Sequence, residues 1–206
     1  EAIGRTLAAR GARVVLGDVD EAAVRATAAS IGRGAVGRAL DVRSTASVEA
    51  FLDQAEATVG PVDVLVNNAG VMWAGPFDEE PETAADRMLD VNSHGVARGV
   101  RAAAPRMRAR GSGQIVTVAS VASHIAPAGE ATYAASKHAV LGYLTAVRQE
   151  LRGTAVQLSV VMPIVVDTEL AAGTSPGGMP ALQPQDVADA VVSAIQRPRF
   201  EVFVPA

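Results

Sequence analysis

The sequence predicts an α/β fold in which helices cover both faces of a mostly parallel sheet. Short Val-rich runs alternate with longer segments of helical periodicity along the whole chain. The runs are continuously apolar, as expected for strands buried on both faces. Glycine and proline turns separate the two kinds of segment. Together these observations favour a doubly wound, three-layer arrangement over an all-helical or all-strand fold.

Five short apolar runs are the expected strands. One follows the turn Gly60-Pro61, and another ends at Pro163. The five runs cover residues 14–16, 62–66, 115–118, 156–162 and 201–204. The carboxyl ends of parallel strands meet at one edge of a sheet, and open α/β sheets bind their ligands there.

Helices with recognisable start signals fill the intervals. Ser44 is the expected N-cap of a helix over residues 44–58, and Asp20 that of a helix from Glu21. Pro184 suits the first position of a helix near the carboxyl terminus. Alternation of this kind is typical of strand–helix–strand units.

The amino-terminal end departs from this pattern. The chain opens at Glu1 and enters a helical pattern over residues 5–10, with no strand before it. A doubly wound sheet needs a strand there, and its absence would leave an apolar slot between two strand edges. We therefore expect the natural protein to carry roughly ten or more residues before Glu1, with a Val/Ala/Ile-rich strand and a Gly-rich turn, and to extend past Ala206.

Composition restricts the function classes. The length of 206 residues predicts a single domain over residues 1–206, with a mobile loop over residues 171–181. A net charge of −4 argues against a nucleic-acid partner. The chain has no cysteine and no histidine pair at metal-ligand spacing, so we expect no metal site. Apolar runs shorter than a bilayer span predict a soluble protein. The absence of cysteine fits a reducing cytosol, so we expect the protein in the cytoplasm.

Tyr133 and Lys137 form the first candidate for chemistry. Residues four apart share one face of a helix, so the lysine ammonium can lie close to the phenol. A free phenol has a pKa of about 10, and a neighbouring cation is expected to lower it. Such a tyrosine can exchange a proton with an alcohol or ketone oxygen.

Two strand ends add polar groups. Ser120 follows the strand over residues 115–118 and lies 13 residues before Tyr133. Its hydroxyl could donate to a substrate oxygen, or it could form a local turn. Asn67-Asn68-Ala69-Gly70 follows the strand over residues 62–66. It suits close approach of the backbone to a cofactor, although asparagine and glycine also form ordinary turns.

These motifs resemble those of the short-chain dehydrogenase/reductase family along nearly the whole chain. Asn67 to Gly70 looks like the family's NNAG signature. Ser120, Tyr133 and Lys137 match its catalytic triad, and Asn92 matches the fourth catalytic residue, which lies at a helix kink in the family. The resemblance implies a Rossmann-type fold and a nicotinamide-dependent oxidoreductase that interconverts secondary alcohols and ketones. Tyr133 would then be the general acid/base, with its pKa lowered by Lys137, and Ser120 would polarise the carbonyl.

The resemblance also implies a set of cofactor-binding residues. These are Ile3, Gly4, Asp18, Asp41, Val42, Asn68, Ala69, Gly70, Tyr133, Lys137, Pro163, Val166 and Thr168. Two positions depart from the family. Ile164 stands where glycine is usual, and Ala2 stands where the middle glycine of the phosphate loop is usual.

Asp18 predicts the choice of cofactor. If Gly4 ends the phosphate loop, Asp18 lies about 20 residues after the first glycine of that loop. An acidic residue there binds the ribose hydroxyls and repels a 2′-phosphate, so we expect NAD. An exposed turn aspartate is the alternative interpretation.

The substrate pocket is expected to be apolar. Its predicted lining is Met72, Trp73, residues 121–125, Ile164 and Val165, which indicates a hydrophobic ketone or alcohol. His124 is either a polar contact or a loop residue. The reaction direction, the physiological substrate and the pathway stay open.

Three function classes remain. An active alcohol dehydrogenase or ketoreductase is favoured, because Ser120 and Asn92 accompany the tyrosine and lysine. An epimerase or enoyl reductase of the same fold is the second, and an idle dinucleotide-binding sensor or scaffold is the third. By the same resemblance, helices over residues 131–152 and 81–110 are expected to form a homodimer or homotetramer; the sequence does not decide between them.

Overall fold

The computed structural model describes residues 1–168, 170 and 180–205. Most of the loop predicted over residues 171–181 therefore lies outside the described residues. The described helices and strands alternate along the chain, as the sequence predicted. In order they are α1 (Ala2–Ala9), β1 (Val15–Asp18), α2 (Glu21–Ile31), β2 (Val36–Ala39), α3 (Thr45–Val59), β3 (Val64–Asn67), α4 (Glu82–Met88), the π-helix η1 (Leu89–His94), α5 (Gly95–Arg110), β4 (Gly113–Val118), the 3₁₀ helix η2 (Val121–Ser123), α6 (Ala131–Glu150), β5 (Val156–Pro163), α7 (Pro184–Gln196) and β6 (Glu201–Val204).

All pairs among the described strands are parallel. β1 pairs with β2, and the other strands form a sheet in the order β3-β4-β5-β6. Asn67 at the end of β3 lies beside Thr117, and Val118 at the end of β4 lies beside Val161. The carboxyl ends of β3, β4 and β5 therefore lie along one edge, where the sequence predicted ligand binding.

An open strand position separates the two sheets. Within the described residues, β1 and β3 are not hydrogen-bonded to each other, and each forms the end of its own sheet. Val15 and Leu16 from β1, and Leu65 and Val66 from β3, are among the residues that line a cavity of about 1560 Å³, which extends to Ser120 and Tyr133. The sequence predicted two strand edges with an apolar space between them, and this part of the cavity has such a lining.

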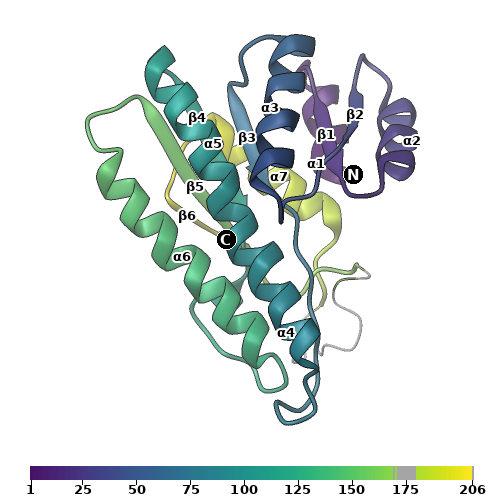
Figure 1. Cartoon of the computed structure of the whole chain (residues 1–206), viewed down its shortest axis with the longest axis vertical. Helices are drawn as coiled ribbons and strands as arrows, with labels where there is room; N and C mark the ends of the chain where they lie inside the picture. Colours follow the sequence, from purple (N-terminus) through teal and green to yellow (C-terminus); the bar gives the residue numbers. More distant parts are fainter. Residues whose placement is uncertain (169, 171–179, 206) are drawn as a thin grey trace.

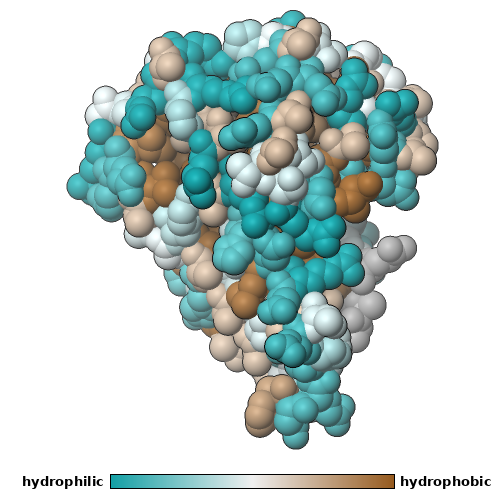
Figure 2. All heavy atoms as spheres, in the orientation of Figure 1, coloured by the Kyte–Doolittle hydropathy of each residue, from teal (hydrophilic) through white to brown (hydrophobic). Residues whose placement is uncertain are grey.

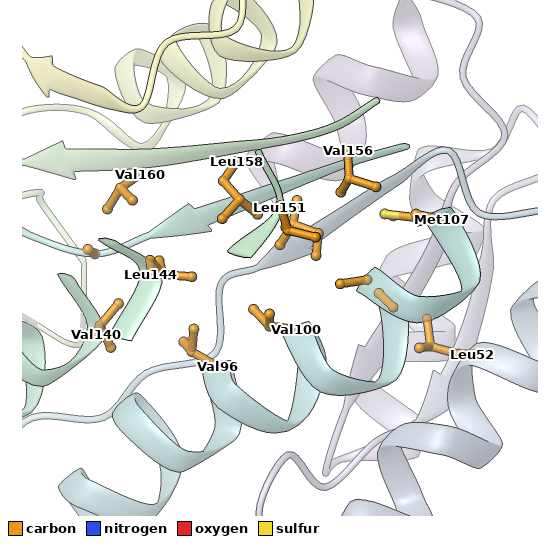
Figure 3. Packing of buried hydrophobic residues seen from close by; sticks show 14 of the residues in the cluster. Leu52, Val96, Val100, Met107, Val140, Leu144, Leu151, Val156, Leu158 and Val160 are labelled. Atoms are coloured by element: carbon orange, nitrogen blue, oxygen red, sulfur yellow. The ribbon is translucent and has the colours of Figure 1, made fainter. Parts of the chain in front are cut away.

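Two helical layers cover the sheets (Figure 1). Helices α3, α5 and α6 lie on one face, and α1, α2 and α7 lie on the other. In the first layer, Val100 of α5 and Leu144 of α6 pack against Leu158 and Val160 of β5 (Figure 3). These side chains are almost fully buried, and burying one such side chain stabilises a fold by roughly 1.5–3 kcal/mol. This packing fixes α6, the helix that carries Tyr133 and Lys137, against the sheet.

The helix start signals are confirmed. The Asp20 carboxylate accepts a hydrogen bond from the Ala23 N–H at 2.9 Å, one turn into α2. Ser44 accepts from the Ser47 N–H at 3.3 Å, and Pro184 is the first residue of α7.

The sequence analysis missed one strand, β2. Its sequence, Val-Gly-Arg-Ala, holds no apolar run. Gly37 of β2 lies directly under α2, and a Cβ there would meet the Val24 carbonyl oxygen at 2.6 Å. The strand therefore depends on the close packing of α2, and the periodicity of hydrophobic residues in the sequence does not indicate such packing.

The outer face of α3, α5 and α6 is mostly hydrophilic, and its apolar residues form small separate groups (Figure 2). Among the described helices, none combines the length and apolar character needed to cross a membrane. In the same part of the chain, His, Asp and Glu side chains form no group of three that could hold a metal ion.

Candidate active site

Tyr133, Lys137 and Ser120 are brought together at the carboxyl edge of the sheet. Tyr133 and Lys137 share one face of α6, and the Lys137 Nζ lies 5.5 Å from the centre of the Tyr133 ring. Ser120 follows β4 and is the N-cap of η2, where its Oγ accepts a hydrogen bond from the Ala122 N–H at 3.1 Å. All three residues are buried yet line the same cavity. The turn interpretation and the substrate-facing interpretation of Ser120 are therefore compatible.

The pKa of Tyr133 does not follow the expectation. Burial of the phenol raises its pKa, a side-chain hydrogen bond with Ser120 lowers it, and the charge of Glu130 raises it further. Burial also lowers the pKa of Lys137, to about 8. The expectation that Lys137 lowers the pKa of Tyr133 is wrong for this structure, because desolvation of both groups outweighs their proximity.

Asn92 holds a buried hydrogen-bond network behind this face. It lies in the π-helix η1 between α4 and α5, which is the kink that the family resemblance implied. Its Oδ1 accepts from the Val71 N–H at 2.8 Å, and its Nδ2 donates to the Val71 carbonyl at 2.9 Å and to the Ser136 Oγ at 3.0 Å. The Ser136 hydroxyl in turn donates to the Tyr133 carbonyl at 2.7 Å. The network ties the segment after β3 to the helix of Tyr133.

The segment after β3 approaches the same place. Gly70 has Asn92 and Lys137 as neighbours: a Cβ there would lie 3.5 Å from the Asn92 Oδ1 and 3.8 Å from the Lys137 Nζ. Asn68 and Ala69 line the cavity beside it. Asn67 has a structural role instead, because its Oδ1 lies so close to Gly99 of α5 that a Cβ there would be 2.3 Å away.

The cavity contains nearly every residue predicted to form the site. Asn92 is the exception, since it is buried behind the cavity wall. The predicted cofactor-binding residues that line the cavity are Ile3, Gly4, Asp18, Asp41, Val42, Asn68, Ala69, Gly70, Tyr133, Lys137, Pro163, Val166 and Thr168.

Gly4 and Asp18 mark the far end of the cavity. Gly4 packs α1 onto β1, and a Cβ there would lie 2.8 Å from the Leu16 Cδ2. That is the role of the last glycine of a phosphate loop, which allows close helix–strand packing. Asp18 ends β1, and its Oδ1 accepts a hydrogen bond from the Asp20 N–H at 3.0 Å. This turn bond orients the carboxylate.

Asp41 is paired within the protein. Arg43 donates to its two carboxylate oxygens from Nε at 2.9 Å and from Nη2 at 2.8 Å. The hydrogen bonds from Arg43 are the main reason that the pKa of Asp41 is lowered. Asp41 still lines the cavity, so the pair presents both charges at its rim.

The predicted substrate lining is mostly found around the cavity. Met72, Val121, Ala122, His124, Ile125, Ile164 and Val165 line it. Ser123 and Trp73 do not. The Trp73 ring packs on Gly75 instead, because that residue leaves room for it. The His124 Nε2 lies 3.0 Å from a Glu201 carboxylate oxygen and its ring lies beside Phe203, so His124 is partly occupied by contacts within the protein.

Sequence reasoning missed several residues that position the site. Ser136 lies within the Tyr133–Lys137 motif, but only the fold places it against Asn92. The segment before α4 lies beside the first turn of α6 (Figure 1), where the Gly75 N–H donates to the Gly129 carbonyl at 2.9 Å. Thr132 donates to the Glu80 carboxylate nearby, one residue before Tyr133. No local sequence pattern predicts contacts between segments that lie so far apart in the chain.

The donor set suits a dinucleotide. Asp18, whose carboxylate suits ribose hydroxyls, lies at one end of the cavity. The backbone at Gly70 lies in the middle. At the other end is the buried Lys137 ammonium, whose pKa is moved by burial alone, without an anionic partner among the described residues. Hydroxyl groups of a ligand would satisfy that ammonium.

Comparison with known proteins identifies the class. The sequence pattern of the short chain dehydrogenase family matches residues 1–177. The chain is 36% identical over 214 aligned residues to the probable oxidoreductase EphD of Mycobacterium tuberculosis, covering 92% of this chain and 36% of that protein. It is also 38% identical to 1-deoxy-11-beta-hydroxypentalenate dehydrogenase of Streptomyces exfoliatus, covering 98% and 78% of the two chains. The chain thus spans about a third of the length of its EphD relatives.

Solved structures agree with this class. A short-chain dehydrogenase/reductase of Burkholderia phymatum in complex with NAD has a TM-score of 0.88 at 32% identity, covering 98% of this chain and 84% of that one. The closed form of a serine dehydrogenase complexed with NADP⁺ has a TM-score of 0.91 at 27% identity, covering 98% and 88%. The protein belongs to the short-chain dehydrogenase family and has its Rossmann-like α/β/α fold.

Proposed function

We propose that this chain is an oxidoreductase that interconverts a secondary alcohol and a ketone with a nicotinamide dinucleotide. The observation that carries the proposal is the convergence of the Ser120, Tyr133 and Lys137 side chains on one cavity at the carboxyl edge of the sheet. Residues 1–206 would form one dinucleotide-binding unit.

The chemistry divides between the protein and the cofactor. When bound, the nicotinamide gives a hydride to the carbonyl carbon, or takes one from the carbinol carbon. In reduction, the Tyr133 hydroxyl gives its proton to the substrate oxygen as the C=O double bond becomes a C–O single bond. The Ser120 hydroxyl donates a hydrogen bond to the same oxygen and stabilises the charge that develops on it. Oxidation reverses each transfer and starts from the phenolate form of Tyr133, which receives the hydroxyl proton.

The protonation state of Tyr133 favours reduction near neutral pH. Because burial raises the pKa of Tyr133, the phenol carries its proton there and can donate it. Asn92 would act as a positioning residue, since it reaches Tyr133 only through Ser136.

The proposed cofactor is NAD. Asp18 supports this choice, because a carboxylate beside the adenosine ribose binds its hydroxyls and repels a 2′-phosphate. The similar structures bind NAD in one case and NADP in another, so the choice rests on Asp18.

The proposed substrate is hydrophobic. Val121, Ile125, Ile164 and Val165 supply apolar walls around the reacting groups. The name of the Streptomyces relative, a dehydrogenase of a hydroxylated pentalenate, is compatible with a secondary alcohol on a hydrophobic skeleton.

We further propose a homodimer or homotetramer in the cytoplasm. The outward face of α6 carries exposed small residues at Ala135, Ala139, Gly142 and Ala146, which would allow close packing against a copy of the helix. A chain without cysteine fits a reducing compartment. Light scattering at micromolar concentration and cell fractionation would test these two points.

The deciding experiment is cofactor turnover with a panel of ketones, secondary alcohols, enoyl thioesters and nucleotide sugars. Ketone reduction and alcohol oxidation with a net change of NADH absorbance would support the proposal. Enoyl reduction alone, or epimerisation without net cofactor turnover, would assign different chemistry. Cofactor binding without turnover of any substrate would indicate a sensor or scaffold.

A further inference from the structure

Glu130 is a carboxylate of the cavity that the proposed chemistry does not use. It is the N-cap residue of α6, the helix of Tyr133, but its side chain makes no capping hydrogen bond. Shorter side chains such as those of Asp and Ser ordinarily accept from the N–H groups of the first turn at this position. Glu130 lines the cavity instead, as do Ser120, Tyr133 and Pro127.

The Glu130 carboxylate lacks a counter-ion among the described residues. Burial is the only influence on its pKa, which it raises. Other carboxylates nearby are paired: Glu80 accepts from Thr132, and Glu201 lies against His124. Among the described residues no salt bridge joins Glu130 to Lys137 or to any other cation. A half-buried carboxylate without a partner is costly, and a ligand that pairs with it recovers that cost on binding.

The position of Glu130 relates it to the reacting carbon. Glu130 is the N-cap of the helix that carries Tyr133 and precedes it by three residues, and both residues line the cavity. The charge of Glu130 also raises the pKa of Tyr133, although less than burial does. A substrate whose oxygen meets Tyr133 and Ser120 therefore places its neighbouring atoms close to this carboxylate.

We propose that Glu130 binds a protonated amine on the substrate, and that the enzyme prefers amino alcohols and amino ketones with the amine one or two carbons from the reacting carbon. This inference rests on the proposed function and specifies its substrate class. The remaining walls, Ile125, Ile164 and Val165, contact the apolar part of the same substrate. Glu130 is thus a specificity-determining residue, while Tyr133 and Ser120 handle the oxygen.

A matched pair of substrates measures the contribution of the ammonium charge alone. 1-Amino-2-propanol and 2-butanol share the same carbinol and the same number of heavy atoms, and they differ only in an ammonium in place of a methyl group. The measurement is kcat/KM for each alcohol with saturating NAD near neutral pH, in wild type, Glu130→Gln and Glu79→Gln. Glu79 is an exposed carboxylate outside the cavity lining and serves as the control.

Wild type should prefer the amino alcohol by at least about tenfold, the size expected of a hydrogen bond between charged groups. In Glu130→Gln the ratio of the two kcat/KM values should fall to within about twofold of one, whereas Glu79→Gln should keep the wild-type ratio. A merely structural role of Glu130 would change both alcohols alike and leave the ratio intact.

The outcomes separate the two proposals. If wild type oxidises 2-butanol without preferring the amino alcohol, or if Glu130→Gln keeps the preference, the role of Glu130 is wrong and the proposed function stands. If wild type turns over neither these alcohols nor any other alcohol or ketone, both proposals are overturned. The wild-type ratio needs no variant, so the inference is tested even if Glu130→Gln does not fold.

Discussion

The two ends of the cavity are built in different ways. At the end proposed to be catalytic, called the catalytic end below, Ser120, Tyr133 and Lys137 are all buried, and Asn92 and Ser136 hold the surrounding backbone through hydrogen bonds of 2.7–3.0 Å. At the other end, Asp18 is exposed at the tip of a two-stranded sheet. One hydrogen bond from the Asp20 N–H orients it.

This difference separates stability from selectivity. The hydrogen-bonded network of Asn92 and Ser136 is expensive to disturb because its groups are buried, so changes to this network should affect folding as well as turnover. An exposed carboxylate contributes little to folding, so changes at Asp18 should alter the preference between cofactors alone.

Removing the Tyr133 hydroxyl should have the largest effect. Tyr133→Phe keeps the ring that packs among Met88, Ala122 and Ala134, so the fold should be retained. General acid/base catalysis typically accelerates a reaction by about 10²–10⁴-fold, so kcat with a ketone should fall by at least about 10²-fold. Tyr143→Phe is the matched control, because this second tyrosine of α6 lies outside the cavity lining and should keep wild-type turnover. Near-normal turnover in Tyr133→Phe would exclude Tyr133 as the acid.

Lys137 should destabilise the cofactor-free protein in a pH-dependent way. Its pKa falls from 10.5 to about 8 on folding, because burial disfavours the charged form. Below pH 8 the folded protein must hold a buried ammonium, and each pKa unit corresponds to about 1.4 kcal/mol, so the full cost is about 3 kcal/mol. Between pH 8 and 10.5 the unfolded chain binds more protons than the folded one, and this cost disappears as the pH rises.

The measurement compares wild type with Lys137→Met, which keeps a side chain of similar length without the charge. Urea unfolding without cofactor should show the variant to be more stable at pH 7 and the difference to shrink toward pH 10.5. Lys137 is the only lysine of the chain, so no other ammonium side chain contributes to this difference. A constant difference across that pH range would contradict the lowered pKa.

Truncating Asn92 should affect both folding and activity. Asn92→Ala leaves the Val71 N–H and carbonyl and the Ser136 hydroxyl without this partner in a buried place. An unsatisfied buried group costs about 1–3 kcal/mol, and the free energy of unfolding should fall by at least that amount. Asn68→Ala, at an exposed position on the same segment, should change it by less than about 0.5 kcal/mol. Equal unfolding midpoints for the two variants would show that the network is not structural.

The sequence predicts the catalytic end better than its supports. Tyr133 and Lys137 are recognisable because helix geometry relates residues four apart, and Ser120 because it follows an apolar strand. Ser136 binding Asn92 and Thr132 binding Glu80 join residues 44 and 52 positions apart. Only the folded arrangement of α4, η1 and α6 brings them together, so no periodicity could reveal them.

Burial explains the error about Tyr133. From the sequence, the charge of Lys137 was expected to determine the pKa of the Tyr133 phenol, because it is the nearest cation. In the structure the dominant influence on both groups is desolvation, which depends on packing by Met88 and Ala122 and by other parts of the chain. Similarly, β2 was not predicted from the sequence, because it is stabilised by helix α2 packing on Gly37 and not by an apolar run.

The smallest expected effect concerns the exposed end. The 2′-phosphate of NADP carries close to two negative charges near neutral pH, and two like charges about 4 Å apart repel by roughly 4 kcal/mol at an effective dielectric of 20. Solvent screening at Asp18 reduces this, but about 1.4 kcal/mol already gives a tenfold preference. Arg43 is the cation of the rim that could compensate, yet both of its bonded nitrogens are directed at Asp41.

Wild type should therefore favour NAD over NADP in kcat/KM by at least about tenfold, and Asp18→Ala should lose most of that preference while its unfolding midpoint stays the same. Asp20→Asn is the control, since asparagine keeps the cap of α2 and removes a neighbouring charge that does not line the cavity. It should keep the preference for NAD. A wild-type enzyme that prefers NADP would instead show that Arg43 leaves Asp41 to bind the phosphate. Arg43→Ala should then abolish NADP use, and the exposed end would be reorganised by its ligand in a way that the buried catalytic end is not.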